Sequence, residues 1–119
     1  MGGMPKPTVK KQKRIHAKIY SLANGEVIDI VTRVVGNGKT KLVKSSKTRN
    51  GESFNGEFIT IGNSSDQQPG TAILIGNKGT VINIGYTQNA LTNNAIGAGK
   101  DNKGVRYKFT CCEIKYVAQ

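Results

Sequence analysis

Residues able to take part in catalysis are few and scattered in this chain of 119 residues. The single histidine, His16, lies beside a run of lysines. The seven acidic residues stand one at a time, without the paired spacing of a catalytic dyad. An active site needs an acid, a base or a nucleophile converging on one place. The sequence therefore predicts a protein that is not an enzyme.

Metal and cofactor sites are not indicated either. Cys111 and Cys112 are adjacent, and consecutive side chains of a strand point to opposite faces, so we expect no disulfide between them. Zinc sites need a second pair of ligands, which the sequence lacks. G-x-G occurs at residues 36–38 and 97–99, but neither copy has the third glycine of a pyrophosphate-binding loop. We expect no metal and no cofactor.

The chemistry that the composition favours is the binding of a polyanion. The chain holds 18 Lys and Arg against seven Asp and Glu, a net charge of +11. Residues 1–49 contain 12 of these cations with only Glu26 and Asp29, whereas residues 50–119 are nearly neutral. Solubility alone does not require one half to carry almost all of the excess. The asymmetry predicts binding to nucleic acid, to RNA more than to DNA.

The candidate nucleic-acid-binding residues are the cations of the basic half and tyrosines that can stack on bases. Cations contact phosphates without reading sequence, and aromatic rings supply stacking platforms. Lysines far outnumber aromatic residues, so we expect nonspecific binding that weakens steeply with salt. The candidates are Lys10, Lys11, Lys13, Arg14, Lys18, Arg33, Lys39, Lys41, Lys44, Lys47, Arg49, Tyr20 and Tyr86.

A hairpin over residues 27–43 positions many of these cations. Residues 27–35 are rich in β-branched side chains, which suit a strand. The Gly-Asn-Gly sequence at 36–38 is a strong signal for a tight hairpin turn. Arg33 and Lys39 flank this turn, so the hairpin offers an apolar side to a core and a cationic edge to a ligand.

The remaining chain predicts further short strands around this hairpin. Residues 1–14 form a basic flexible arm, and residues 15–119 form one domain. Residues 63–70 form a loop, and a short helix is expected near the start of 88–104. The C-terminal strand can close a barrel, extend the sheet or pair with another copy. The expected strands are 15–22, 26–35, 40–48, 58–61, 71–75, 80–86 and 105–117.

Two stretches resemble translation initiation factor 1A of eukaryotes and archaea. V-x-R-V-V-G-N-G-K (31–39) is similar to the family's opening strands, and P-G-T-A-I-L-I-G with N-K-G-T-V-I-N-I-G-Y (69–86) is similar to its later ones. The resemblance covers roughly residues 27–90. It implies an OB-type barrel that contacts RNA and the small ribosomal subunit. The family's basic loop, its tryptophan and its acidic tail are absent here.

The expected fold is therefore all-β, a small five-stranded OB-type barrel with a basic N-terminal arm and an extra C-terminal strand. The first functional hypothesis is an RNA-binding protein like initiation factor 1A. The alternative is a structural protein that packages DNA or RNA nonspecifically, in a virion core or in chromatin, as a homo-oligomer formed through the C-terminal strand. A third hypothesis is a basic adaptor that docks on acidic proteins. We expect an intracellular location, cytoplasmic or nuclear or virion-associated, because neither a signal peptide nor a membrane span is recognisable.

Overall fold

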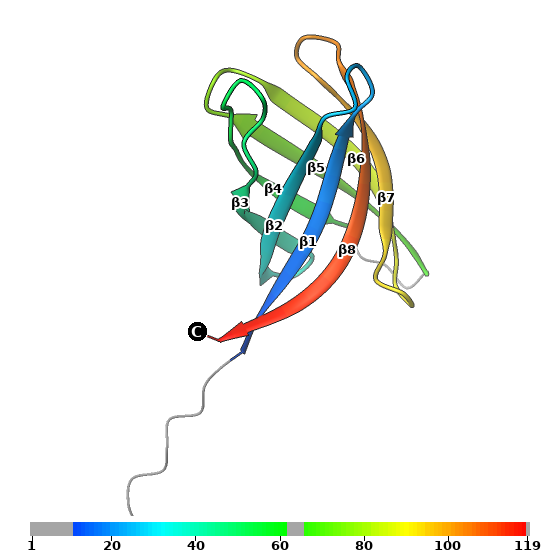
Figure 1. Ribbon diagram of the computed structural model, residues 1–119. Coiled ribbons are helices and arrows are strands. Elements are labelled where there is room, and N and C mark those ends of the chain that lie inside the picture. Colours follow the sequence, from blue (N-terminus) through cyan, green and yellow to red (C-terminus); the bar gives the residue numbers. More distant parts are fainter. Residues whose placement is uncertain (1–10, 62–65, 119) are drawn as a thin grey trace, which may run out of the picture.

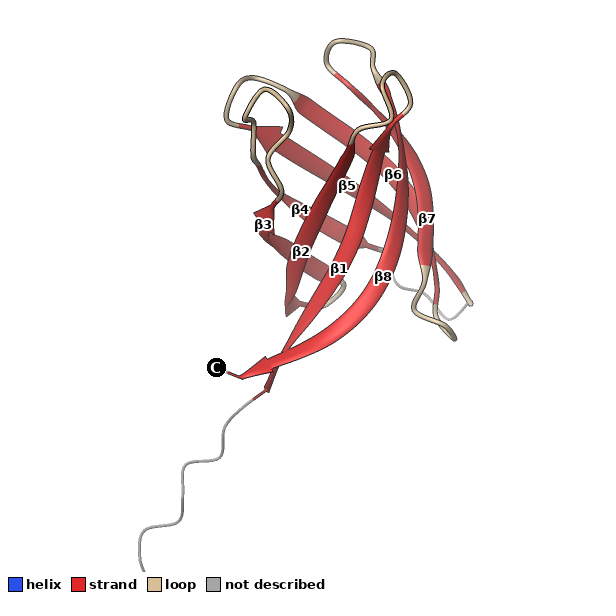
Figure 2. Ribbon diagram, viewed as in Figure 1, coloured by secondary structure: helices blue, strands red, loops and turns tan. Residues whose placement is uncertain are grey.

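A computed structural model describes residues 11–61 and 66–118, and every regular element in it is a strand (Figure 2). The strands follow one another around the barrel in sequence order, each antiparallel to the next, and β8 pairs with β1 to close it (Figure 1). Within the described ranges, no helix is long and apolar enough to cross a membrane. The strands are β1 (Lys11–Ser21), β2 (Val27–Gly36), β3 (Lys39–Ser45), β4 (Phe54–Thr60), β5 (Gln67–Gly76), β6 (Val81–Asn89), β7 (Ala95–Asp101) and β8 (Arg106–Ala118).

The prediction of a closed all-β barrel is confirmed, but the number of strands is eight and not five. Each expected strand overlaps an observed one. Seven strand ranges were expected along the chain, and the one that was not expected is β7, which lies in the segment where a short helix was predicted. Gly97 and Gly99 disfavour a helix, and β7 pairs along its length with both β6 and β8. Of the three roles left open for the C-terminal strand, the structure has it close the barrel.

Strand β1 begins at Lys11, so the last four residues of the predicted arm (1–14) belong to the barrel. Residues 1–10, including Lys10, lie outside the described residues. The predicted loop at 63–70 also differs in part, because Gln67 already begins β5. The N-terminal end of β1 and the C-terminal end of β8 lie side by side, with Lys11 and Ala118 as Cα partners.

Inward-facing side chains fill the barrel. Eight strands enclose a space that side chains can occupy completely. The rings of Phe58, Tyr86 and Phe109 pack together in its centre, with centroids 5.4–6.0 Å apart. Ile19 and Leu74 beside them are fully buried. Burial of this apolar surface is the main force that holds the sheet closed.

The cysteines correct a prediction, because a disulfide joins Cys111 to Cys112. The peptide between them is cis. Side chains alternate between faces only along a regular strand. Here the register of β8 against β1 shifts, since His16 pairs with Glu113 and Ala17 pairs with Cys111, which leaves Cys112 without a Cα partner. The expectation of opposite faces therefore does not apply at this position.

Candidate polyanion interface

Four cations form a line across four adjacent strands on the outside of the barrel. Arg14 of β1 and Arg33 of β2 are Cα partners. Arg33 is in turn the partner of Lys41 on β3, and Arg14 is the partner of Lys115 on β8. We call Lys115, Arg14, Arg33 and Lys41 the cationic row. Neighbouring strands lie about 4.8 Å apart, so the row spans roughly 14 Å.

The two arginines at the centre of the row lack a counter-charge. Like charges directly opposite each other destabilise a sheet. At the ends of the row, Lys41 lies 3.7 Å from Glu57 and Lys115 lies 3.5 Å from Glu113. Among the described residues, no carboxylate forms an ion pair with Arg14 or Arg33. Nη1 of Arg14 is buried and has no hydrogen-bond partner. The centre of the row therefore carries positive charge that no described carboxylate balances.

Further cations surround the row. Lys39 lies 3.3 Å from Glu57 and Lys18 lies 3.8 Å from Asp29, so both are partly neutralised. Lys44 is exposed and forms no ion pair with the described part of the chain. Surface ion pairs of this kind are worth about 0–1 kcal/mol, so a phosphate can replace the carboxylate at little cost.

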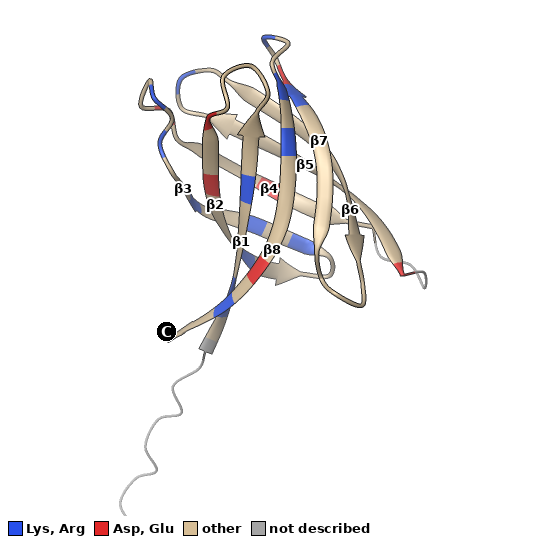
Figure 3. Cartoon of the chain, turned by 45° about the vertical axis from the view of Figure 1, so that its right-hand side comes forward, with Lys and Arg blue, Asp and Glu red and all other residues tan. Residues whose placement is uncertain are grey.

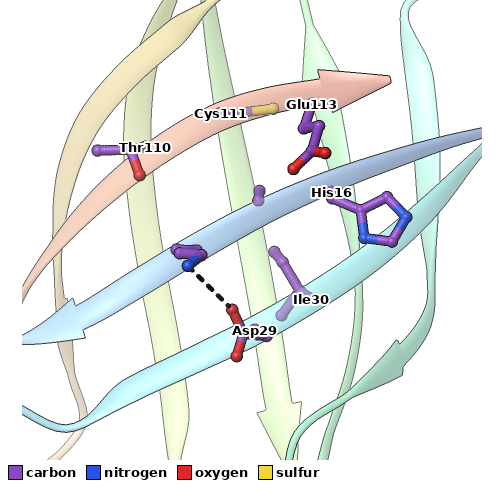
Figure 4. A pocket seen from close by; sticks show the side chains of 8 residues that line it. His16, Asp29, Ile30, Thr110, Cys111 and Glu113 are labelled. Carbon is purple, nitrogen blue, oxygen red and sulfur yellow. Dashed lines mark ion pairs between the residues drawn. The ribbon is translucent and has the colours of Figure 1, made fainter. Parts of the chain in front are cut away.

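A hollow of about 380 Å³ lies next to the row on β1, β2 and β8. Figure 4 shows His16 and Glu113 on one side of it and Asp29 on the other, and Asp29 forms its ion pair with Lys18 at 3.8 Å. Its two acidic and two basic side chains nearly balance, so it is a poorer anion site than the cationic row. Within the described ranges, no three His, Cys, Asp or Glu residues are placed to hold a metal ion.

The structure brings most of the predicted cations to this surface but not all of them. Lys47 and Arg49 lie in the loop between β3 and β4, at the opposite end of the barrel, where Arg49 pairs with Glu26 at 3.6 Å. By strand alternation Lys13 shares the face of Ile15 and not that of Arg14. The predicted cations that do lie on the outer face of β1, β2 and β3 are Arg14, Lys18, Arg33, Lys39, Lys41 and Lys44.

The two tyrosines proposed for stacking lie in different environments. Tyr86 faces the interior, is 8% exposed, and its hydroxyl lies 2.8 Å from that of Thr60. It offers no free ring face to a base. Tyr20 lies on the outside of β1, half-buried, with Val27 and Lys108 as its neighbours on the flanking strands. Tyr20 is thus the stacking candidate that shares a surface with the cations.

Sequence reasoning missed Lys115 as a member of the site. Regular alternation along β8 would place Lys115 on the face of Tyr107, and the register shift between Cys111 and Glu113 moves it to the outer face, opposite Arg14. Figure 3 shows the outcome, with Lys and Arg on β1, β3 and β8, while β5 and β6 carry none. Strands β1, β2 and β3 together hold eight Lys and Arg against one acid, Asp29.

The comparisons with known proteins do not assign the chain to a family. No family model matches it, and no curated protein or solved structure is significantly similar. The geometry of the cationic row is therefore the main guide to function.

Proposed function

We propose that this protein binds the phosphate backbone of nucleic acids through the cationic row. The observation that carries the proposal is the direct pairing of Arg14 with Arg33 across β1 and β2, with no carboxylate in the described part of the chain to neutralise either. A phosphate bound at each arginine would offset their mutual repulsion.

The dimensions of the row suit a short stretch of backbone. Arginine presents a planar fork of donors that matches phosphate oxygens, and it binds them in a bidentate manner. A row of about 14 Å corresponds to roughly four nucleotides at 3.4 Å of helix axis per nucleotide. Contacts of this kind position the nucleic acid without reading its bases. We therefore propose nonspecific binding, of the kind that a packaging protein uses.

The proposal is tested by measuring binding to single-stranded RNA, duplex DNA and small ribosomal subunits across a salt series. We expect similar affinities for RNA and DNA and a steep dependence on salt. For four phosphates on a duplex, the slope of log K against log salt reaches about −3.6. Absence of binding to every nucleic acid at low salt would overturn the proposal and favour an acidic protein surface as the ligand.

A ribosomal role is the second candidate, because the motif that resembles initiation factor 1A (31–39) is the hairpin that carries Arg33 and Lys39. Its distinguishing result is binding to small ribosomal subunits that persists at physiological salt while binding to free RNA and duplex DNA is lost. Loss of all three together supports nonspecific backbone binding.

A further inference from the structure

The outer face of β5 and β6 is exposed but uncharged. The ten residues of β5 and the nine of β6 include no Lys, Arg, Asp or Glu. On β5, the side chains of Ile73 and Ile75 are 52% and 57% exposed. The two isoleucines form an exposed apolar patch beside uncharged polar residues such as Thr71 and Asn83. In a protein of net charge +11, an exposed apolar patch on an uncharged face indicates a contact surface.

The side chains on this face are larger at one edge than at the other. One cross-strand row runs Ile59, Thr71, Gly85 and Ala98 from β4 to β7, so it is bulky at the β4 end and flat at the β7 end. A Cβ atom placed on Gly85 would meet nothing within 4 Å. An open hollow of about 920 Å³ lies over this flat part, with Ile96 among its lining residues.

We propose that two copies of the chain associate through this face as a twofold dimer. The twofold axis runs parallel to β5 and β6 and passes between them. It places β4 of one copy over β7 of the other, and each residue keeps its position along the strand direction. Ile59 of each copy then lies over Ala98 of the second copy, and Thr71 lies over Gly85. Each copy supplies both the projection and the hollow, as a self-complementary interface requires.

The charged residues at the edge of the face are placed so that the same axis brings opposite charges together. The adjacent row runs Glu57, Ile73, Asn83 and Lys100. The twofold axis lays Glu57 of one copy over Lys100 of the other, and this contact occurs twice. Lys100 forms no ion pair with the described residues of its own chain, so it is available for this contact. Glu57 would share its carboxylate with Lys39 and Lys41 of its own chain, which lie 3.3 and 3.7 Å from it.

The arrangement also explains how two strongly basic chains can approach each other. The cationic row lies on β8, β1, β2 and β3, on the side of the barrel away from β5 and β6. In the dimer the two cationic rows face outward in opposite directions, which keeps their mutual repulsion small. Each dimer would then present two separate polyanion surfaces.

The size of the face predicts reversible association. Ten residues of strand measure about 33 Å and four strands measure about 19 Å across, which gives roughly 600 Å² per copy. Stable interfaces bury about 800 Å² per partner. We therefore expect a dimer that dissociates on dilution and is not obligate.

The decisive experiment measures the mass of the full chain by sedimentation equilibrium over a range of concentrations. We expect a monomer–dimer equilibrium in which Ile73→Arg lowers the association constant at least tenfold. The matched control is Val43→Arg on β3, which adds the same charge at a residue that is 43% exposed, and it leaves association unchanged. A wild-type chain that stays monomeric at high concentration, or equal effects of the two variants, overturns the proposal.

A charge exchange tests the orientation. Glu57→Lys and Lys100→Glu each place like charges together in the dimer, so each alone weakens association about tenfold or more. The double variant E57K/K100E restores the pair and recovers most of the affinity. Thermal melting of each variant checks that the barrel stays folded. Failure of the double variant to recover affinity would contradict this orientation. If truncation at Lys115 dissociates the dimer and Ile73→Arg does not, the contact is made by the C-terminal strand instead.

Discussion

The hydroxyl of Tyr107 donates a hydrogen bond of 2.8 Å to Oδ2 of Asp101, and both residues are buried where β7 turns into β8. Oδ1 of the same carboxylate accepts the backbone N–H groups of Lys103 at 2.8 Å and Val105 at 3.0 Å. One side chain thus fixes the turn and holds a core ring in place. This end of the barrel is closed by carboxylates that have their hydrogen-bond partners.

Acid is expected to weaken the barrel partly through Asp101. Burial raises the pKa of its carboxyl, but the hydrogen bonds from Tyr107 and from two backbone N–H groups outweigh this, so the pKa lies below its ordinary value of 3.8. A carboxyl with a lowered pKa stabilises the fold above its unfolded pKa, and this stabilisation is lost as pH falls through the folded pKa. Asp101→Asn should be less stable at neutral pH, and it should lose less stability than the wild type as the pH falls below the ordinary pKa of 3.8. Urea unfolding at each pH measures this, and parallel curves for the two proteins would contradict it.

Alkali is expected to act through Tyr107. Burial raises the pKa of its hydroxyl, and the neighbouring Asp101 raises it further, well above the ordinary 10.0. The stabilisation is present below the unfolded pKa and is lost as pH rises above it toward the folded pKa. Tyr107→Phe should cost about 1–2 kcal/mol at neutral pH, since Asp101 loses a donor. It should also lose less stability than the wild type above about pH 10. Denaturant unfolding in alkaline buffers gives both quantities.

Glu52 is expected to be the most sensitive carboxylate for stability. It is 3% exposed and accepts the N–H groups of Lys78 and Thr80, each at 3.0 Å, and the Thr80 hydroxyl at 2.6 Å. Glu52→Ala should lower the free energy of unfolding by about 2–4 kcal/mol, because buried donors lose a charged acceptor. Glu113→Gln, at an exposed ion pair, should change it by less than about 0.5 kcal/mol. Similar losses in the two variants would show that Glu52 is not needed at this turn.

Two glycines on neighbouring strands are expected to respond oppositely to alanine. A Cβ on Gly70 would lie 2.3 Å from the ring of Tyr86, whereas one on Gly85 would meet nothing within 4 Å. Gly70→Ala should therefore cost about 1–3 kcal/mol through overpacking. Gly85→Ala should be neutral or stabilising by about 0.5 kcal/mol, since alanine loses less backbone entropy. Thermal unfolding at low protein concentration compares them, and a neutral Gly70→Ala would mean that Tyr86 can move away.

The arginine pair is expected to account for about two phosphate contacts. Arg14→Gln combined with Arg33→Gln should make the log–log salt slope shallower by about 1.4 on single-stranded RNA and about 1.8 on duplex DNA. The control removes two exposed cations at the opposite end of the barrel, Lys103→Gln with Arg106→Gln. If the control changes the slope equally, binding follows net charge and the cationic row has no special role.

The strands were largely predictable because their signals are local. β-branched runs and glycine turns predicted the β2–β3 hairpin, and alternation predicted β8. Strand β7 was missed because Ala95, Gly97 and Gly99 occupy alternate positions on one face, which leaves no period of large apolar residues. Its position between β6 and β8 comes from pairing partners distant in sequence. This one segment accounts for the eighth strand, since seven strand ranges were recognised in the sequence, but it does not by itself account for the difference from a five-stranded barrel.

The candidate site was predictable in composition but not in arrangement. The hairpin placed Arg33 and Lys41 on one surface from sequence alone. The meeting of Arg14 with Arg33 depends on the register of β1 against β2, which no local signal determines. The burial of Tyr86, in contrast, could have been read from the sequence, because Ile82 and Ile84 share its face of the strand.

The neighbouring positions of Lys11 and Ala118 make the order of the strands nearly circular. Every strand has two partners, so the place where the polypeptide is cut matters little to the finished barrel. A short peptide that joins Lys11 to Ala118, with a new opening at the exposed turn of residues 22–25, should yield a permuted chain that assembles the same closed sheet.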